Sequence, residues 1–381
     1  MYNVGQLKDS VSGLLTGLNL NNVTNLEKAL ERAARVLVTK IDIPEASSKQ
    51  AITLYNGVYA YEAPTSLFGG ALIDFRPQGN SRSEIDYVYK NPIEVFDRTK
   101  ALLPNGYQVA FEYNKGTPII KIASPKPYPR VILDSMHDDT GWTAAGSASA
   151  LVEDETVYYE SPVSLRFTLT GSSVGTLTKT INSIDIDKYE DVCVGFLAIR
   201  TPSIVNLTSI AVRVGSSDSA YDEVSNTEGF LGAWTVDEWL LVAFDFSGAT
   251  STGTPDWNAI DYIQVRVTHS GTITNFRVGG FWLALPSHHE LIFQTAAIFL
   301  ASGALSKTIS DDTDEIILND AAYVLYEYEC AVTIAEQSSG GNLDGVALGY
   351  KTKLEKELYP TYRADNPSEE IRSVGSYWEP L

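Results

Sequence analysis

Cysteine is scarce in this chain, with only Cys193 and Cys330 among 381 residues. Two thiols so far apart form no disulfide framework, and a zinc site needs more ligands at closer spacing. Both side chains are therefore expected to be buried and to behave as small apolar groups. Histidine is almost as rare, and none of the four stands in an H-E-x-x-H motif. A disulfide scaffold and a zinc hydrolase are both disfavoured.

Long apolar runs are missing as well. No stretch reaches the roughly 18 residues that a membrane-spanning helix needs. The N-terminal MYNVGQLKDS lacks the basic region and apolar run of a signal peptide. We therefore expect no membrane partner and synthesis in a cytoplasm.

Positive charge is in deficit, because 28 Lys and Arg face 48 Asp and Glu and the net charge is −20. Residues 1–130 carry +3, residues 131–287 carry −13 and residues 288–381 carry −10. Affinity for nucleic acid depends on Lys and Arg at the phosphates, so specific DNA binding is disfavoured. An acidic surface can instead let DNA pass without holding it.

Recognisable catalytic arrangements are absent too. Residues 171–175 read GSSVG, but strand-like segments on both sides do not give the strand–helix elbow that a nucleophilic serine needs. The adjacent carboxylates of Asp138–Asp139 and of Asp311–Asp312 point to opposite faces of a strand, so neither pair forms an acid/base dyad by itself. We expect that the chain is not an enzyme.

Two amphipathic helices are predicted at the start of the chain. Apolar residues recur at helical spacing in residues 4–18. A second helix begins at the capping box formed by Thr24 and Glu27 and ends at Pro44. Both predict helices that pack one apolar stripe on a core.

A small mixed region follows up to residue 130. Residues 51–63 predict two strands around an Asn56-Gly57 hairpin turn. Residues 91–103 predict a short helix with Pro92 at its first position. Further strand-like runs end in SPKPYP, whose prolines favour an extended spacer.

From Val131 the sequence changes to short runs rich in Thr, Ser and Val, separated by turn residues. Many short strands at regular spacing predict an antiparallel β-sandwich or jelly roll over residues 131–286. Insertion of a whole domain at a surface turn is tolerated when its ends lie close together. We interpret this segment as such an insertion, able to fold alone.

Helical periodicity returns after Pro286. The segment HHELIFQTAAIFLASGALS predicts a helix that is apolar over much of its circumference, as in a subunit interface. The expected interface residues are Leu291, Ile292, Phe299 and Leu300.

Two more helices are predicted within residues 321–341 and 345–362. The last segment, residues 359–381, is expected to be extended. Its aromatic tip predicts docking on a neighbouring protein through Tyr377, Trp378 and Glu379.

Two ligand sites can be formulated for the sandwich. Carboxylates near its start could bind a structural Ca²⁺, namely Asp138, Asp139, Glu153 and Asp154. The alternative is solvated turn charge. Aromatic side chains could stack on sugar rings, namely Tyr221, Trp234, Trp239 and Trp257. The alternative is that Trp234 and Trp239 belong to the core. No other cofactor is expected.

Residues 131–286 resemble the jelly-roll, carbohydrate-binding-module-like domains of phage structural proteins. The resemblance is carried by VILDSMHDDTGWTA, SPVSLRFTL, IAVRVGSSDSAYDEV and TGTPDWNAIDYIQVRV. It is more specific for the fold than for a ligand.

The flanking segments resemble head–tail adaptor (connector) proteins of tailed phages. The resemblance rests on the order of the predicted elements, with AITLYNGVYAYEAP, GTPIIKIASPKP and HELIFQTAAIFLASGAL as its segments. It implies an α+β multidomain fold, in which a helical bundle with a small β-sheet carries the inserted antiparallel sandwich. The expected domains are residues 1–130 with 287–358, residues 131–286, and the tail 359–381.

The resemblance implies a virion structural protein at the neck, made in the bacterial host cytoplasm. Its subunits would form a dodecameric ring that joins the portal protein to tail proteins and surrounds passing DNA. The alternative is a collar or tail-fibre protein that binds a host surface glycan through the jelly roll. A fibre should show trimeric heptads or shallow repeats, and the sequence shows neither.

Overall fold

The computed structural model describes residues 2–15, 23, 25–41, 43, 46–64, 71–78, 86–89, 106–114, 117–123, 130–160, 162–338, 345–365 and 372–373. The chain divides into two compact units. The flanking unit comprises Met1–Ile52, Glu62–Pro125 and His288–Leu381. The sandwich unit comprises Thr53–Tyr61 and Lys126–Ser287.

Helices of the flanking unit share one apolar core. They are α1 (Val4–Leu14), α2 (Leu26–Lys40), α4 (Asp320–Ser338), α5 (Gly345–Lys353), a π-helical turn (Leu354–Leu358) and α6 (Tyr359–Asp365). Leu7, Leu30 and Tyr326 are fully buried in this core. The Tyr326 hydroxyl donates a hydrogen bond to the Leu30 carbonyl (2.8 Å), which joins α4 to α2. None of the described helices combines the length and apolarity needed to span a membrane.

The capping box lies at a different helix from the predicted one. Asn3 caps α1, where its side chain accepts from the Gln6 amide and the Gln6 side chain accepts from the Asn3 amide. Helix α2 begins after Asn25, which has a left-handed backbone and makes no side-chain cap hydrogen bond. Thr24 lies outside the described residues, and the Glu27 carboxylate pairs with Lys8 at 2.8 Å instead.

Short strands complete the flanking unit. One sheet has the order β1 (Tyr2–Asn3), β23 (Glu315–Ile316), β21 (Phe299–Ala301) and β22 (Ala304–Ser306). A second has the order β2 (Ser47–Leu54), β20 (Ser287–Gln294), β4 (Ala71–Pro77) and β24 (Arg372–Ser373). The parallel pair β5 (Asp86–Tyr89) and β6 (Gly106–Asn114) continues into antiparallel β7 (Thr117–Ala123).

The helix predicted after Pro286 is wrong: its residues form β20, β21 and β22. Leu291 is buried and lies opposite Phe75 of β4, whereas Ile292 is half-buried, as in a strand with one covered face. Phe299 is fully buried among the helices, beside the Tyr326 ring, and Leu300 is half-buried. The apolar run is therefore satisfied within the chain, and Phe299 offers no subunit interface. The helix prediction failed for a physical reason, because a short apolar run fits a buried strand as well as a helix.

The predicted hairpin at Asn56-Gly57 is also wrong, although its turn exists. Gly57 has a φ of +88°, which favours glycine. However, β2 pairs with β20 rather than with β3 (Ala60–Glu62). The turn itself is tied by Tyr61, whose hydroxyl donates to the Val58 carbonyl (3.0 Å) and accepts from the Tyr55 amide (2.8 Å).

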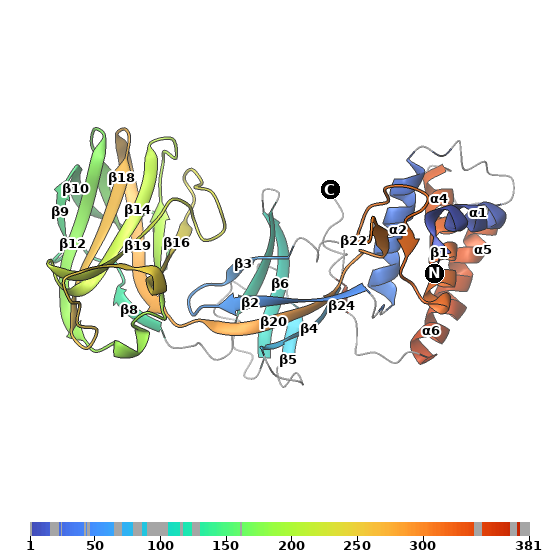
Figure 1. Cartoon of the computed structure of the whole chain (residues 1–381). Coiled ribbons are helices and arrows are strands. Elements are labelled where there is room, and N and C mark those ends of the chain that lie inside the picture. The colour runs from blue at the N-terminus through green and yellow to red at the C-terminus, as the bar shows by residue number, and fades with distance from the viewer. Residues whose placement is uncertain are drawn as a thin grey trace. The chain divides into compact units, whose positions relative to one another are not determined.

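The sandwich unit is built from two antiparallel six-stranded sheets, as predicted for this segment (Figure 1). The first sheet has the order β10 (Ala148–Asp154), β11 (Ser164–Leu169), β19 (Ile273–Ala284), β13 (Val194–Arg200) and β16 (Leu240–Asp245), and β8 (Arg130–Asp134) also pairs with β19. The second has the order β17 (Thr250–Thr252), β15 (Ala220–Asn226), β14 (Leu207–Ser217), β18 (Ile260–His269), β12 (Ser173–Ile184) and β9 (Thr143–Gly146). The chain crosses repeatedly between the sheets, as in a jelly roll.

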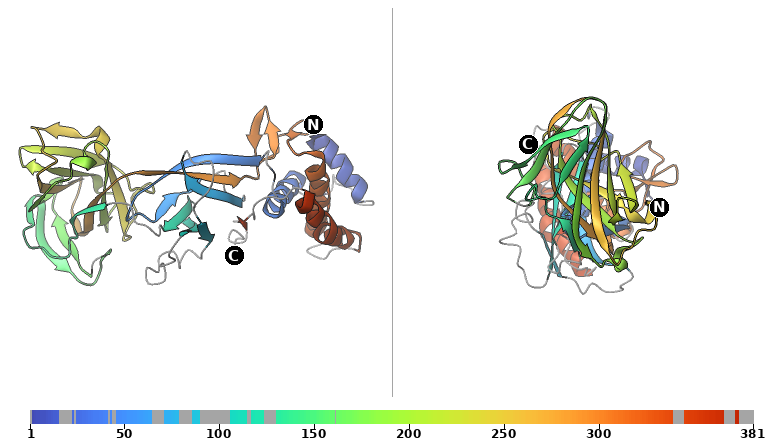
Figure 2. Two further views of the ribbon diagram at one scale, coloured as in Figure 1. Left: turned by 90° about the horizontal axis from the view of Figure 1, so that it is seen from below. Right: turned by 90° about the vertical axis from the view of Figure 1, so that its left-hand side faces the viewer.

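The inner faces of the two sheets enclose one apolar core. Figure 2 shows the strands of this unit from two further directions. Phe167, Phe276 and Phe281 of the first sheet face this core and are almost fully buried. Alternation along a strand then turns their neighbours Arg166 and Arg277 outward. On β19 a bulge at Gly280, with φ +119°, lets Gly279 and Trp282 both face outward.

Residues Thr53–Tyr61, here called the turn segment, cover part of the outer face of the first sheet. The Tyr55 ring lies 5.2 Å from that of Phe196 and 6.3 Å from that of Phe230. The indole of Trp282 donates to the Asn56 carbonyl (3.0 Å). A segment distant in sequence therefore completes the packing of the sandwich unit.

The C-terminal segment is partly helical rather than extended, because α6 covers Tyr359–Asp365 and Tyr359 and Tyr362 are buried. The predicted docking residues Tyr377, Trp378 and Glu379 lie outside the described residues, as does the helix predicted over residues 91–103.

Candidate functional site

The four aromatic residues predicted to stack on sugars do not form one site. Trp257 is buried in the core, where its indole donates to Asp222 (2.8 Å). Trp234 is partly buried against the same core. Tyr221 lies on the second sheet, with the Arg213 guanidinium 4.1 Å from its ring centre. Only Trp239 remains on the outer face of the first sheet.

Trp239 and Tyr159 flank Gly279 on the outer face of β19, and these three residues are called the aromatic notch. A Cβ atom at Gly279 would lie 2.9 Å from Trp239 Cη2 and 2.9 Å from Tyr159 Cβ. The six-membered edge of the indole therefore rests on the strand where a side chain is missing. The two rings are 5.8 Å apart and inclined by 52°, and both are half-buried. Tyr158, the next residue, is half exposed.

Three arginines from neighbouring strands lie in register beside the notch, and they are called the arginine row. Arg166 of β11 is opposite Arg277 of β19, and Arg277 is opposite Arg200 of β13. Like charges directly opposite one another destabilise a sheet. The row therefore needs anionic partners.

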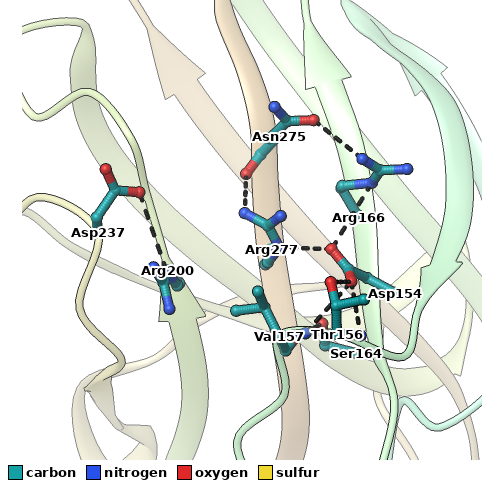
Figure 3. A network of polar contacts seen from close by, with 9 residues as sticks. All are labelled: Asp154, Thr156, Val157, Ser164, Arg166, Arg200, Asp237, Asn275 and Arg277. Carbon is teal, nitrogen blue, oxygen red and sulfur yellow. Dashed lines mark hydrogen bonds and ion pairs between the residues drawn. The ribbon is translucent and has the colours of Figure 1, made fainter.

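Asp154 supplies most of that compensation (Figure 3). Its Oδ2 lies 2.8 Å from Arg277 Nε and 3.8 Å from Arg166 Nε, while its Oδ1 accepts from the Thr156 hydroxyl (2.6 Å). Burial acts to raise the pKa of this carboxyl, but the hydrogen bonds from Thr156 and Arg277 outweigh it and hold the pKa below its ordinary value. Asn275 binds the same two arginines, through its side-chain oxygen to Arg166 and its carbonyl to Arg277.

Arg200 is compensated much less well. Asp237 Oδ1 is 3.9 Å from its Nε, beyond hydrogen-bond distance. The Nε atom is buried and has no hydrogen-bond partner within the described part of the chain. The side chain as a whole is 27% exposed. Arg200 therefore has one unpaired buried donor, Nε, and a partly exposed side chain at the end of the row (Figure 3).

The carboxylates proposed for Ca²⁺ are not brought together as a ligand set. The Asp154 carboxylate is hydrogen-bonded to Arg277 and Thr156. The Glu153 carboxylate accepts from the Asp139 amide (3.3 Å), and the Asp138 carboxylate lies 3.0 Å from the His137 ring. Within the described residues, no three His, Cys, Asp or Glu side chains are grouped as metal ligands. The arrangement gives the calcium hypothesis no support.

The flanking unit contains a second candidate site, a cavity of about 140 Å³ with charged side chains in its lining. Its charged lining is balanced, with Arg32, Lys40 and Lys351 against Glu329, Glu336 and Glu355. Buried Glu329 accepts from the Tyr359 hydroxyl (2.6 Å), and burial raises its pKa despite Lys40 at 3.8 Å. Because these charges satisfy one another, the cavity selects no ligand charge.

The sequence named Trp239 as one candidate for stacking, with a core position as the alternative, and did not indicate Tyr159 or the arginine row. One signal was available: each arginine follows apolar residues in a predicted strand, in SLRF, LAIR and NFRV. Their alignment depends on the register of β11, β19 and β13, which single strands do not specify.

No protein-family model matches the chain, and no curated protein matches it. Among similar solved structures is a family 11 carbohydrate-binding module from Clostridium thermocellum in complex with a β-1,3-1,4-mixed-linked tetrasaccharide. Its identity is 15%, its TM-score is 0.32, and the match covers 42% of this chain and 96% of that one. A family 30 carbohydrate-binding module of a cellulosomal cellulase from the same organism is 12% identical, with a TM-score of 0.31. That match covers 42% of this chain and 96% of the module. TM-scores this low establish no shared ligand.

Proposed function

We propose that the sandwich unit binds a glycan on the outer face of its first sheet, at the aromatic notch. The observation that carries the proposal is the seating of Trp239 against Gly279. An indole that rests with its edge on a glycine stands on the sheet, so its faces are directed sideways along the surface, where a sugar ring can lie against one of them. Aromatic side chains combine a large apolar face with little loss of conformational freedom.

Polar groups around the notch supply the second requirement of a sugar site. Arginine offers up to five donors in a fixed plane and suits sugar oxygens as acceptors. Asp237 and Asn275 add oxygen acceptors beside the row. Apolar contact with a few convergent polar groups is the usual composition of a small-ligand site.

The adaptor role expected from the sequence stays a prediction. Its subunit interface was placed on a helix at Leu291–Leu300, and those residues instead form strands within the flanking unit. The collar or fibre alternative, in which the jelly roll recognises a surface glycan, agrees better with the outer face of the first sheet.

The proposal is tested with the full chain and its Trp239→Ala variant. Electrophoresis through gels that contain mixed-linked β-glucan, galactan, polygalacturonate or alginate should retard the native chain in at least one case. Loss of an aromatic contact at the centre of a site costs about 2 kcal/mol or more, so Trp239→Ala should weaken binding at least about tenfold.

Tyr221→Ala is the matched control, since it removes an aromatic ring from the second sheet. It should bind like the native chain, and both variants should keep the native melting temperature within a few degrees. Migration of the native chain unchanged by all four glycans, or equal losses in the two variants, would contradict the proposal.

A further inference from the structure

We infer that the bound sugar is acidic and that its uronate carboxylate is held by Arg200 at the end of the arginine row. This inference rests on the proposed glycan binding and specifies the class of glycan. It follows from the charge arrangement of the row.

The row is an arrangement that stability alone disfavours. Two directly opposed arginine pairs occur on three adjacent strands, Arg166 with Arg277 and Arg277 with Arg200. Opposed like charges destabilise a sheet, and features that break such a rule concentrate at functional sites. A bound anion would remove this repulsion.

The compensation inside the chain is uneven along the row. Asp154 is 5% exposed and pairs with Arg277 and Arg166. Asp237, the acid facing Arg200, is 56% exposed and remains 3.9 Å from it. Arg200 is therefore the least compensated member of the row, since its Nε has no hydrogen-bond partner within the described residues.

Arg200 and the indole lie where one sugar residue can reach both. The pairing of β13 with β16 ends at Ile199 and Leu240, and Arg200 and Trp239 are the residues that follow this pair on the two segments. The Trp239 ring lies over Gly279 of β19, two residues from Arg277, and Arg277 is opposite Arg200. A pyranose stacked on Trp239 can then direct a ring carboxylate at Arg200, whose planar fork matches it with two parallel hydrogen bonds.

The charge of the surrounding domain makes this inference selective. Residues 131–287 carry a net charge of −13, which repels a polyanion at long range. Unspecific electrostatic attraction is therefore not expected to retain an acidic glycan. Binding of a polyanion by so acidic a domain requires a local cationic site, and the row provides one.

The experiment compares polymers that differ only in their carboxylates. Polygalacturonate and alginate oligomers are each tested beside the same oligomers after reduction of the carboxylates to primary alcohols. Calorimetric titration of the full chain at about 50 mM salt should give a dissociation constant at least tenfold lower for one acidic oligomer than for its reduced form. Dextran sulfate serves as a control for unspecific attraction of polyanions.

Arg200→Gln should abolish this preference, because binding of the acidic oligomer falls about tenfold or more and becomes no tighter than binding of its reduced form. Its melting temperature should equal or exceed the native value, because one opposed charge is removed. Arg213→Gln on the second sheet makes the same change in net charge at the pair with Glu223. It should keep the preference.

Each other outcome overturns the inference. If the reduced oligomers or a neutral glucan bind as tightly as the acidic ones, the glycan proposal stands and the acidic class is wrong. If Arg213→Gln weakens binding of the acidic oligomer as much as Arg200→Gln does, the loss is caused by the change in net charge, and Arg200 does not contact the carboxylate. If no glycan binds, the proposed function fails and the inference fails with it.

Discussion

Asp154 is the residue on which the polar network of the first sheet depends. Its buried carboxylate joins Arg277, Arg166 and Thr156, so its removal leaves two opposed arginines without their shared partner. Loss of one member of a buried ionic group is strongly destabilising. We expect Asp154→Asn to lower the free energy of unfolding of the sandwich by about 2 to 3 kcal/mol at pH 7.

The same substitution has a pH signature. A carboxyl whose pKa is lowered on folding stabilises the fold above its unfolded pKa of about 3.9, and this contribution is lost as the pH falls further. The native sandwich should therefore lose stability below about pH 4, and Asp154→Asn should show a smaller loss. Denaturant titration followed by tryptophan fluorescence measures this, since five of the six tryptophans lie in the sandwich unit. Asp138→Asn, at an exposed turn, is the control, and an identical acid slope in native and Asp154→Asn chains would refute the assignment.

Residue identity alone predicted part of the site. Indoles are rare enough that Trp239 could be named from the sequence, but its environment and that of Trp257 look alike there. The structural features that place Trp239 at the surface are the missing side chain at Gly279 and the bulge of β19 at Gly280, and neither can be recognised from the sequence around Trp239. The arginines could not be grouped, because a shift of one residue in register would move each to the other face.

Strand β21 (Phe299–Ala301) gives a test of the corrected element. Phe299 is fully buried in the helical core, whereas Leu300 beside it is half-buried. We expect Phe299→Ala to cost about 3 to 5 kcal/mol and Leu300→Ala about 1 kcal/mol, because only the first empties a packed position. Unfolding followed by circular dichroism at 222 nm reports on this core, since the described α-helices lie in the flanking unit.

Opposite results would favour the helical interpretation. A helix in a subunit interface would make both substitutions harmless to the isolated monomer and harmful to assembly. Native-like unfolding of Phe299→Ala together with altered oligomeric mass would therefore contradict the strand assignment.

Among elements, the sequence predicted long amphipathic helices and alternating strands best. Helix α2, of 15 residues, is specified by a periodic apolar stripe, whereas α4, of 19 residues, is buried over much of its circumference. The helix prediction for residues 288–306 was wrong because the apolar residues there fit both the helical and the strand periodicity. Pairing with the distant strands β4 and β23 makes the segment a set of strands.

At the scale of the whole molecule, the turn segment limits how independent the inserted domain can be. The sequence predicts that residues 131–286 fold alone, and both sheets do lie within residues 130–284. However, Phe196, Phe230 and Trp282 are covered by Tyr55 and Asn56 from outside that range. We expect residues 126–287 to fold alone but to melt several degrees lower than a version carrying residues 53–61 on a Gly/Ser linker, since buried aromatic area is lost.

Differential scanning calorimetry of the two proteins measures this difference. A third version, with Tyr55→Ser and Tyr61→Ser in the linked segment, should melt like the fragment without it. If all three melt at one temperature, the turn segment contributes nothing to the sandwich. No sequence pattern indicated this contact, because it joins residues that are about 140 positions or more apart.

The pairing of β8 with β19 has a mechanical consequence. The chain enters the sandwich at Arg130 and leaves it at Ala284, and these residues are opposite one another in an antiparallel pair. Hydrogen bonds of such a pair run across the strands, so tension between the two ends acts along the bonds and breaks them one at a time. Force transmitted along the chain would peel this corner open at low load and extend the tether, while the remaining strands keep their pairing.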